Sequence, residues 1–465
     1  MIGEARLKNG IRVKYERMES IRSTAIGVWV GAGSRHERPN SLGISHFIEH
    51  MLFKGTKKRT AKQIAEEIDY VGGQINAFTA KDYTCYYTKT LDSHIGLAAD
   101  ILSDIMMRSK LLKSDINLER NVILEEINMY EDSPDELVHD LLSETVWKNS
   151  PLGNPILGRP STLANIDRAA MRDYMQERYA PGNIVISAAG SLEEKEFAAI
   201  LEDRFGRLGA KKAAAGGGDT GRSGGGDDTG NRADGIADAE RGDRADGDTD
   251  GEVEYEAGIC LKRKETEQIH LCIGFDGIEL GNDDIYALNL ANNMFGGGMS
   301  SILFQKIRED LGLVYSIYSY VSAYKNAGLY AIYAGMQPEN AERVFDLIVG
   351  EINAFKKEGL SADLLNKAKE QFKGGFYMGL ENPNARMSAL GKSELLLGHI
   401  NTPDEIVEKI EKVTVGDIFD VIRRTFDLDK MSICAAGRIG SGFESALTDA
   451  GRRMGETDRI RDELA

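Results

Sequence analysis

Two histidines and a glutamate within residues 46–50 are the part of this sequence best suited to metal chemistry. His46 and His50 stand four residues apart, and Glu49 directly precedes the second histidine. On a helix, residues three and four apart share one face, so all three side chains would project into the same space. Zinc favours imidazole nitrogen, and the order His-x-x-Glu-His is an inverted zinc-protease motif with Glu49 as the candidate general base. The alternative is a pair of histidines that share a helical face without binding metal.

A third ligand is expected from a second helix. Residues 114–130 carry Ser114 and Asp115 as cap and first-turn acid, followed by apolar residues at helical spacing. Within this segment Glu119 and Glu126 are seven residues apart, two helical turns, and therefore project from nearly the same face. One carboxylate would complete a three-ligand site and the other would support it. Taken alone, these acids could equally be the solvated face of the helix.

Residues 43–56 resemble the extended signature of the pitrilysin/insulinase family of zinc peptidases almost residue for residue. Within that family the chain is most similar to the bacterial branch that resembles mitochondrial processing peptidase. The resemblance implies that the third ligand lies about 76 residues past the second histidine, which selects Glu126, with Glu119 in support and Glu125 without a role. It further implies one zinc ion per chain, bound by His46, His50 and Glu126.

The resemblance also assigns residues outside the histidine motif. An arginine and a tyrosine seven apart reach toward the scissile peptide in the family, and Arg308 and Tyr315 match that pattern. The family equivalents of Asn76 and Ala77 contact substrate backbone, and we expect substrate to add a strand along residues 73–78, which include Phe78. Judged on residue type alone, Arg308 would be an exposed helix charge and Tyr315 an ordinary strand aromatic. A glycine run at 296–298 before a helix at 302–310 could suggest phosphate binding, but it lacks the Gly-Lys-Ser/Thr ending of a P-loop.

The elements that position these residues occur twice along the chain. Residues 178–190 and 424–437 each read as a helix end, a turn and a short buried strand that closes on glycine. Strands and amphipathic helices alternate upstream in both halves, which predicts an α+β fold of two homologous domains, each with a mainly antiparallel sheet. The resemblance implies that the two domains close like a clamshell around a chamber. In the second half, near residues 286–295, three asparagines stand where the first half has its metal-binding residues, so that half should bind no metal: Asn289, Asn292 and Asn293.

Composition divides the chain into four segments. We expect a metal-binding peptidase domain at 1–208, a disordered Gly/Asp-rich linker at 209–252, a homologous domain without a metal site at 253–440, and a polar tail at 441–465. The linker has eleven Asp or Glu, six Lys or Arg and one large apolar residue, Ile236, so it cannot bury enough surface to offset its ordering entropy. A calcium-binding glycine/aspartate repeat would need an apolar residue in each nine-residue unit, which is missing.

Charge and cysteine content limit the partners and the compartment. A net charge of −17 argues against a nucleic-acid surface and against an anionic membrane as partners. The four cysteines have no Cys-x-x-Cys spacing, which favours buried thiols in a reducing compartment over a cysteine zinc site. No run of 18 apolar residues and no apolar signal core is present, so we expect a cytoplasmic protein.

These observations predict a zinc metalloendopeptidase that cleaves peptides or unfolded polypeptide segments with metal-activated water and a glutamate base. A non-catalytic scaffold, like the zinc-free relatives in respiratory complexes, is disfavoured by the intact ligands and base. A subunit that is active only beside a partner is the third hypothesis, since some relatives divide the metal site and the Arg/Tyr pair between two chains. Because both sets occur here in one chain, we expect a self-sufficient homodimer.

Overall fold

The first part of the chain forms one six-stranded sheet with helices packed against it. The computed structural model describes residues 2–209, 253–357, 361–453 and 460–463. The elements before the break are β1 (Ile2–Arg6), β2 (Arg12–Arg17), β3 (Ser23–Val30), η1 (Ser34–His36), α1 (Ile44–Leu52), α2 (Ala61–Tyr70), β4 (Gln74–Thr79), β5 (Thr84–Leu91), η2 (Asp92–His94), α3 (Ile95–Arg108), α4 (Lys113–Glu131), α5 (Pro134–Val146), η3 (Pro151–Gly153), α6 (Pro160–Leu163), α7 (Arg168–Arg178), η4 (Pro181–Asn183), β6 (Ile184–Gly190) and α8 (Glu194–Phe205).

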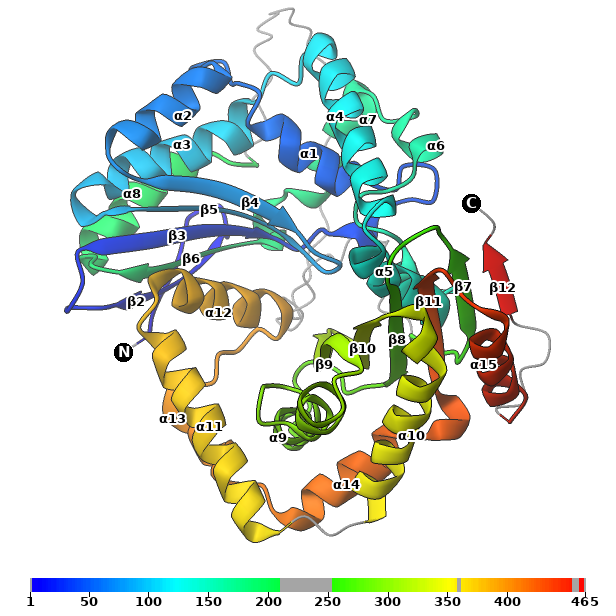
Figure 1. The fold of residues 1–465 in the computed structure, drawn as a ribbon. Coiled ribbons are helices and arrows are strands. Elements are labelled where there is room, and N and C mark those ends of the chain that lie inside the picture. The colour runs from blue at the N-terminus through cyan, green and yellow to red at the C-terminus, as the bar shows by residue number, and fades with distance from the viewer. Residues whose placement is uncertain (1, 210–252, 358–360, 454–459, 464–465) are drawn as a thin grey trace, which may run out of the picture.

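The second part forms another six-stranded sheet, beside the first one in Figure 1. Its elements are β7 (Ile259–Arg263), β8 (Ile269–Asp276), α9 (Asp284–Phe295), η5 (Phe304–Asp310), β9 (Val314–Tyr324), β10 (Ala327–Met336), η6 (Pro338–Asn340), α10 (Ala341–Lys357), α11 (Ala362–Leu380), α12 (Pro383–Leu396), α13 (Pro403–Lys412), α14 (Val415–Thr425), η7 (Leu428–Lys430), β11 (Ser432–Gly437), α15 (Ser441–Arg453) and β12 (Ile460–Glu463).

The two sheets have the same internal arrangement. Their strand orders are β1-β2-β6-β3-β5-β4 and β12-β7-β11-β8-β10-β9, and most neighbours are antiparallel. In each sheet the fourth strand of this order is followed in the chain by an α-helix, which is α1 after β3 and α9 after β8. This confirms the predicted α+β fold with two homologous, mainly antiparallel halves, and it leaves β4 and β9 as edge strands.

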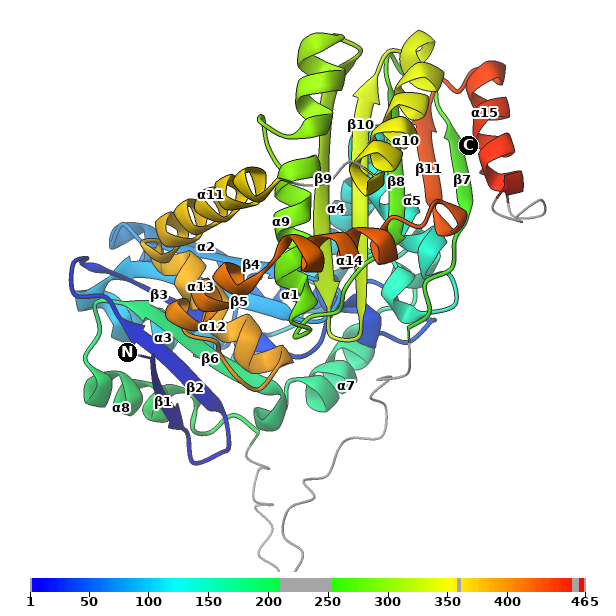
Figure 2. The ribbon, with the colours of Figure 1, turned by 90° about the horizontal axis from the view of Figure 1, so that it is seen from below.

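One helix of each half packs against the sheet of the other half. Helix α12, from the second half, packs on β6, β3 and β2 of the first sheet, while α5, from the first half, packs on β11 and β8 of the second (Figure 1). Strand β6 reads Ile-Val-Ile-Ser-Ala-Ala-Gly and is buried along its whole length, because its two faces are covered by different halves of the chain. The view from below shows α11 and α13 as the connections that lead to and from α12 (Figure 2).

The contact of α12 with the first sheet is close and partly polar. The Trp29 indole Nε1 donates to Ser187 Oγ at 2.8 Å, and Ser187 Oγ donates to the carbonyl of Met387 at 2.8 Å. A Cβ added at Gly391 would lie 2.0 Å from Trp29 Nε1, so only glycine allows α12 to approach so closely. An ion pair of 3.0 Å joins Arg12 to Glu394 at the same interface.

Within the segment 441–465, expected to be a polar tail, the described residues 441–453 and 460–463 instead belong to the second half. Helix α15 places Phe443 and Leu447 in the hydrophobic core, and β12 pairs in parallel with β7 at the edge of the sheet. Two apolar residues at helical spacing were too weak a signal in a mainly polar stretch. The predicted linker 209–252 lies outside the described residues except for Gly209. Within the described segments, every helix is too short or too polar to cross a membrane.

Candidate metal centre

Helix α1 presents two histidines on one face because its other face is apolar and buried. Phe47, Ile48, Met51 and Leu52 are all buried in the first core, which fixes the rotation of the helix about its axis. The helix starts after Gly43, whose φ of 90° would strain any other residue type. The buried Glu37 carboxylate accepts hydrogen bonds from the backbone N–H groups of Gly43 and Ser45, at 2.6 and 2.8 Å, and so takes the place of an N-cap side chain.

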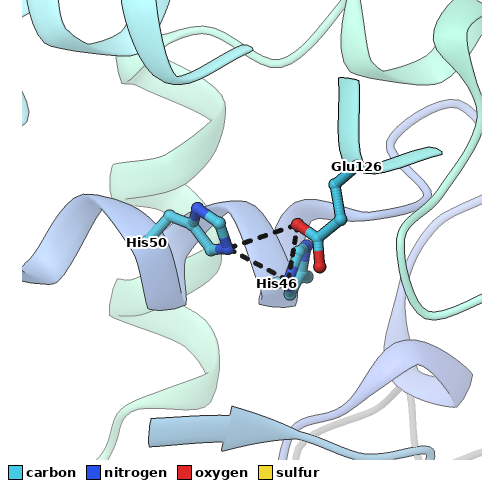
Figure 3. A group of neighbouring side chains, drawn as sticks. All are labelled: His46, His50 and Glu126. Atoms are coloured by element: carbon cyan, nitrogen blue, oxygen red, sulfur yellow. Dashed lines mark hydrogen bonds and ion pairs between the residues drawn. The ribbon is translucent and has the colours of Figure 1, made fainter. Parts of the chain in front are cut away.

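The third side chain comes from α4, which packs against α1. This helix begins at Lys113 with Leu112 at the N-cap position, so the predicted cap, Ser114, lies inside the first turn and makes no capping bond. Glu126 Oε2 lies 3.8 Å from His46 Nε2 and 3.7 Å from His50 Nε2, and the two imidazole Nε2 atoms lie 3.1 Å apart (Figure 3). His46, His50 and Glu126 are thus brought together as predicted, with the three ligand atoms within 4.8 Å of one another.

This geometry fits a tetrahedral zinc ion. Zinc–ligand bonds of about 2.0–2.1 Å at tetrahedral angles put neighbouring ligand atoms roughly 3.3 Å apart, close to the observed 3.1–3.8 Å. The donors are two imidazole nitrogens and one carboxylate oxygen, a set that zinc accepts in catalytic sites. Burial, with His50 nearby, lowers the pKa of His46 to about 3, so its imidazole is neutral and keeps a lone pair for a metal.

Glu119 contacts the His50 ring at Nδ1, the nitrogen that faces away from Glu126. One carboxylate oxygen of the buried Glu119 lies 2.9 Å from His50 Nδ1, and the other lies 2.6 Å from the Lys54 ammonium. A carboxylate that accepts from Nδ1–H leaves Nε2 as the ligand atom and holds the ring in place. His46 has no such support, since its buried Nδ1 has no hydrogen-bond partner within the described residues. Lys54 was missed in the sequence; it stands four residues after His50, just beyond the end of α1.

Glu49 lies beside the three candidate ligand residues without being one of them. Its Oε2 accepts a hydrogen bond of 2.6 Å from the hydroxyl of Thr79, the last residue of β4. Burial raises the pKa of Glu49, an effect that the Thr79 bond and His50 oppose and that Glu126 reinforces. Burial likewise raises the pKa of Glu126. Thr79 was also missed, although strand alternation could have placed it on the same face as Ala77.

Strand β4, which carries the expected substrate residues, is the free edge of the first sheet. The backbone N–H of Ala77 donates to the Asn76 side-chain oxygen at 2.8 Å, so this N–H is not used for pairing with β5. Phe78 is 36% exposed and touches Trp29, Tyr83 and Tyr87 through edge-on aromatic contacts. A chain that paired with β4 would therefore meet a backbone donor and an aromatic side chain.

Arg308 and Tyr315 both lie at irregular points of the second half. The expected helix at 302–310 becomes π-helical over η5, and the Arg308 guanidinium lies 4.6 Å from the centre of the Phe304 ring. In the pairing of β9 with β10, Ser316 and Val314 face consecutive residues of β10, so Tyr315 is the extra residue of a β-bulge and is 75% exposed. In the described part of the chain, no hydrogen bond or ion pair connects Arg308 or Tyr315 with the three metal-ligand candidates.

Tyr315 nevertheless faces the first half. It lines a cavity of about 660 Å³ together with Asp135, Glu136 and His139 of α5, the helix that follows α4. His139 Nδ1 lies 2.7 Å from the Tyr320 hydroxyl, a contact that ties α5 to β9. The cavity is therefore formed by both halves of the chain.

Comparisons with known proteins agree with this arrangement. Residues 12–160 match the insulinase domain (peptidase family M16), and residues 165–372 match the peptidase M16 inactive domain. The chain is 42% identical to the uncharacterized zinc protease YmxG of Bacillus subtilis, over 92% of this chain and 97% of that protein. It is 36% identical to an uncharacterized zinc protease of Streptomyces coelicolor, over 96% and 91% of the two chains.

Solved structures share the fold at lower identity. A protease from Helicobacter pylori superposes with a TM-score of 0.81 at 19% identity, over 94% of this chain and 99% of that chain. A structure from Pseudomonas fluorescens, described as a peptidase M16 inactive domain, gives a TM-score of 0.80 at 19% identity, over 95% and 98% of the two chains.

Proposed function

Because the chain belongs to the insulinase family of peptidases, M16, we propose that it is a zinc-dependent endopeptidase that hydrolyses peptides or unfolded polypeptide segments. The observation that carries this proposal is the convergence of His46, His50 and Glu126 beside the buried carboxylate of Glu49. Its relatives in Bacillus and Streptomyces are named zinc proteases, and the ligand set has the composition that zinc prefers.

Glu49 is proposed as the general base. His46, His50 and Glu126 would hold one zinc ion per chain, which would supply Lewis-acid activation of water at neutral pH. Glu49 takes the proton from the attacking water and passes it to the leaving amine, a role worth about 10²- to 10⁴-fold in rate. Its burial favours this role, since a desolvated carboxylate is a stronger base.

Arg308 and Tyr315 are proposed to act on the oxyanion that forms during peptide hydrolysis. A phenolic hydroxyl and a guanidinium are donors of the kind that stabilise developing negative charge. Bulges and π-helical turns recur beside active sites, where they re-aim side chains, and these two residues occupy one of each. Tyr315 lines a cavity together with residues of α5, which supports a reaction site between the two halves.

Substrate is proposed to bind as an added strand along β4. The Ala77 N–H, occupied by the Asn76 side chain, would pair with the substrate backbone once Asn76 rotates away. The side chain of Phe78 lies on the opposite face of β4 from that of Ala77, and there it would contact a side chain of the bound substrate. Pairing through the backbone recognises extended chains of many sequences, which suits peptides and unfolded segments rather than folded proteins.

The oligomeric state and the compartment remain proposals of the same kind. Because the metal-binding set and the Arg/Tyr pair lie in one chain, we expect a homodimer that needs no different partner subunit, nucleic acid or membrane. A cytoplasmic location accords with four buried cysteines, none of which forms a disulfide. We also retain the division into a peptidase domain at 1–208, a linker at 209–252 and a second domain from 253, which now extends past 440.

Zinc content and peptide cleavage test the proposal together. The purified chain should contain about one zinc by elemental analysis and should cleave members of a pool of quenched-fluorescence decapeptides. Glu126→Gln should lose most of the zinc, whereas Glu49→Gln should keep zinc and lose turnover by 10²- to 10⁴-fold. Full zinc occupancy in Glu126→Gln, or more than a tenth of wild-type kcat in Glu49→Gln, would contradict these roles.

A further inference from the structure

Thr79 connects the edge strand β4 to the proposed base. The side chains of Ile75, Ala77 and Thr79 lie on the same face of β4, since they are two residues apart, and this face packs against α1. The Thr79 hydroxyl donates a hydrogen bond of 2.6 Å to Glu49 Oε2. The other carboxylate oxygen, Oε1, takes no part in this bond and is the oxygen left to receive a proton.

The position of Thr79 is fixed by the turn that follows it. Ala80 N donates to the carbonyl of Tyr83 at 2.8 Å, which closes the β4–β5 hairpin, and Ser34 N donates to the carbonyl of Ala80 at 3.1 Å. A buried ion pair of 2.7 Å between Arg35 and Asp82 anchors the same turn to η1. A donor held at such a rigid turn defines one position for the carboxylate that it binds.

We propose that Thr79 is a positioning residue for Glu49, which holds Oε2 so that Oε1 is directed to the water that Glu49 deprotonates. This inference rests on the proposed function, because Thr79 would act only through Glu49 as the general base. Thr79 belongs to β4, so the strand proposed to bind substrate would also orient the carboxylate of the base. Substrate and proton acceptor would then be aligned by one element.

The second half contains the same kind of contact without a base. Ser319, on the edge strand β9, donates from Oγ to Asn292 Oδ1 on α9 at 2.7 Å. A hydroxyl on the edge strand that binds a polar side chain of the adjacent helix is therefore common to both halves. What differs is the acceptor, an amide in the second half and a carboxylate in the first. The duplicated contact thus separates a packing role, which both hydroxyls would share, from the positioning role that only Thr79 would have.

The test compares Thr79→Val with Thr79→Ser in the full-length, zinc-loaded protein. Valine keeps the shape of threonine and removes the donor, whereas serine keeps the donor. With the decapeptide that wild type cleaves fastest as the probe, we expect kcat of Thr79→Val to fall about 10- to 100-fold, the loss of one hydrogen bond to a charged group. KM and zinc affinity, measured by chelator competition, should stay within about twofold, because Glu49 binds neither substrate nor metal. Thr79→Ser should recover kcat to within about threefold of wild type.

Two control variants measure the packing role alone. Ser319→Ala removes the matching hydroxyl from the second half, and Thr88→Val makes the same Thr-to-Val change on the same face of the first sheet. The Thr88 hydroxyl is buried and has no hydrogen-bond partner in the described residues. Both controls should retain kcat within about twofold. A kcat of Thr79→Val above half the wild-type value would overturn the proposal. It would also be overturned if Thr79→Ser, or the control Ser319→Ala, lost as much kcat as Thr79→Val.

A structural readout separates this inference from the proposed function. If wild type cleaves no peptide, or if Glu49→Gln is as active as wild type, the proposed function fails whatever Thr79 does. Crystal structures of wild type and Thr79→Val then decide the positioning role directly. A displaced or multiply oriented Glu49 carboxylate in Thr79→Val supports it, and an unchanged carboxylate overturns it.

Discussion

The two glutamates of α4 that face the histidines have different partners, and this difference supports the different roles proposed for them. Glu126 Oε2 lies 3.7 Å from His50 Nε2, on the ligand side of the ring, whereas Glu119 lies 2.9 Å from His50 Nδ1, on the opposite side. Glu119 also forms an ion pair of 2.6 Å with the Lys54 ammonium. Sequence spacing alone allowed either glutamate to be the ligand, and the positions of the two ring nitrogens now favour Glu126.

We predict that Glu119→Gln weakens zinc binding without abolishing it. Glutamine can still accept from Nδ1–H, but it loses the charge that Lys54 pairs with, and such supporting partners are typically worth 10- to 100-fold in metal affinity. Competition with a chromophoric chelator measures the change. Glu125→Gln, one residue before Glu126 in α4, is the matched control and should leave the affinity unchanged. Equal affinities in wild type and Glu119→Gln would refute the supporting role.

His36 predicts a pH dependence of stability at the junction of the two halves. Its Nδ1 accepts a hydrogen bond of 3.2 Å from the backbone N–H of Gly33, which requires a neutral ring. Burial, with the nearby charges of Arg35, Arg178 and Lys325, lowers the pKa of His36 to about 3. The unfolded chain, with the ordinary histidine pKa of about 6.5, therefore binds more protons than the folded chain between these two values.

Wild type should consequently lose stability relative to His36→Gln as the pH falls below 6.5. The contribution of neutral His36 is fully present above this pH and is lost progressively toward pH 3, by at most about 1.4 kcal/mol per pH unit. Thermal melts of both proteins from pH 8 to pH 4.5 give the difference in Tm, and acid effects on other groups cancel in that difference. A Tm difference that is constant over this range would refute the assignment.

At the scale of elements, irregular backbone marks the two functional candidates of the second half. The η5 segment is π-helical around Arg308, Gly312 has a φ of 61° in the following turn, and β9 begins with the bulge at Tyr315. A regular strand would have turned the Tyr315 side chain to the face set by alternation with Ser316 and Val314. The bulge removes that constraint and leaves the phenol largely exposed beside the cavity shared with α5.

We predict that Tyr315→Phe lowers kcat about 10²-fold, in the range measured for single oxyanion donors, while zinc content and Tm stay unchanged. Steady-state cleavage of the selected decapeptide measures this effect. Tyr377→Phe, which removes another exposed phenolic hydroxyl from the second half, is the control and should be silent. If both variants behave like wild type, Tyr315 contributes no donor to the reaction.

At the scale of the whole molecule, the exchange of α5 and α12 makes each sheet dependent on the other half. Trp29, the largest fully buried side chain of the first sheet, contacts α12 rather than a helix of its own half. The row of buried Cys260, Cys434 and Cys272 on neighbouring strands of the second sheet lies in the core beneath α5. Neither half would keep these faces covered if the two were separated.

Gly391→Ala should therefore destabilise the whole protein. Its new Cβ would lie 2.0 Å from Trp29 Nε1, and overpacking of this kind costs about 1–3 kcal/mol. Gly350→Ala in α10 is the matched control, because its Cβ would meet nothing within 4 Å and helical alanine stabilises by about 0.4–1 kcal/mol. Thermal melts should show a lower Tm for the first variant and a higher Tm for the second. A rise in Tm for both would mean that α12 does not pack on Trp29 in solution.

Local periodicity by itself determined the shared face of the histidine motif, the strands and the duplicated order of elements. His46, Glu49 and His50 must share a face on any helix, because 3.6 residues make one turn, and the alternation of apolar residues likewise defines the strands. The resemblance then selected Glu126 from two helical glutamates. Such features depend on neighbours in sequence, and they persist whatever the surrounding fold.

Contacts between distant segments could be decided only by the tertiary structure. Thr79 reaches Glu49, Lys54 reaches Glu119, and α12 reaches Trp29 because of how elements pack, and packing depends on side-chain volumes across the whole core. The bulge at Tyr315 and the burial of α15 follow from the same cause, since strand register and helix docking are collective properties of a sheet and its core. The proposed ligand set and its supporting Glu119 could therefore be predicted from spacing and resemblance, whereas the contacts of Lys54 and Thr79 could not.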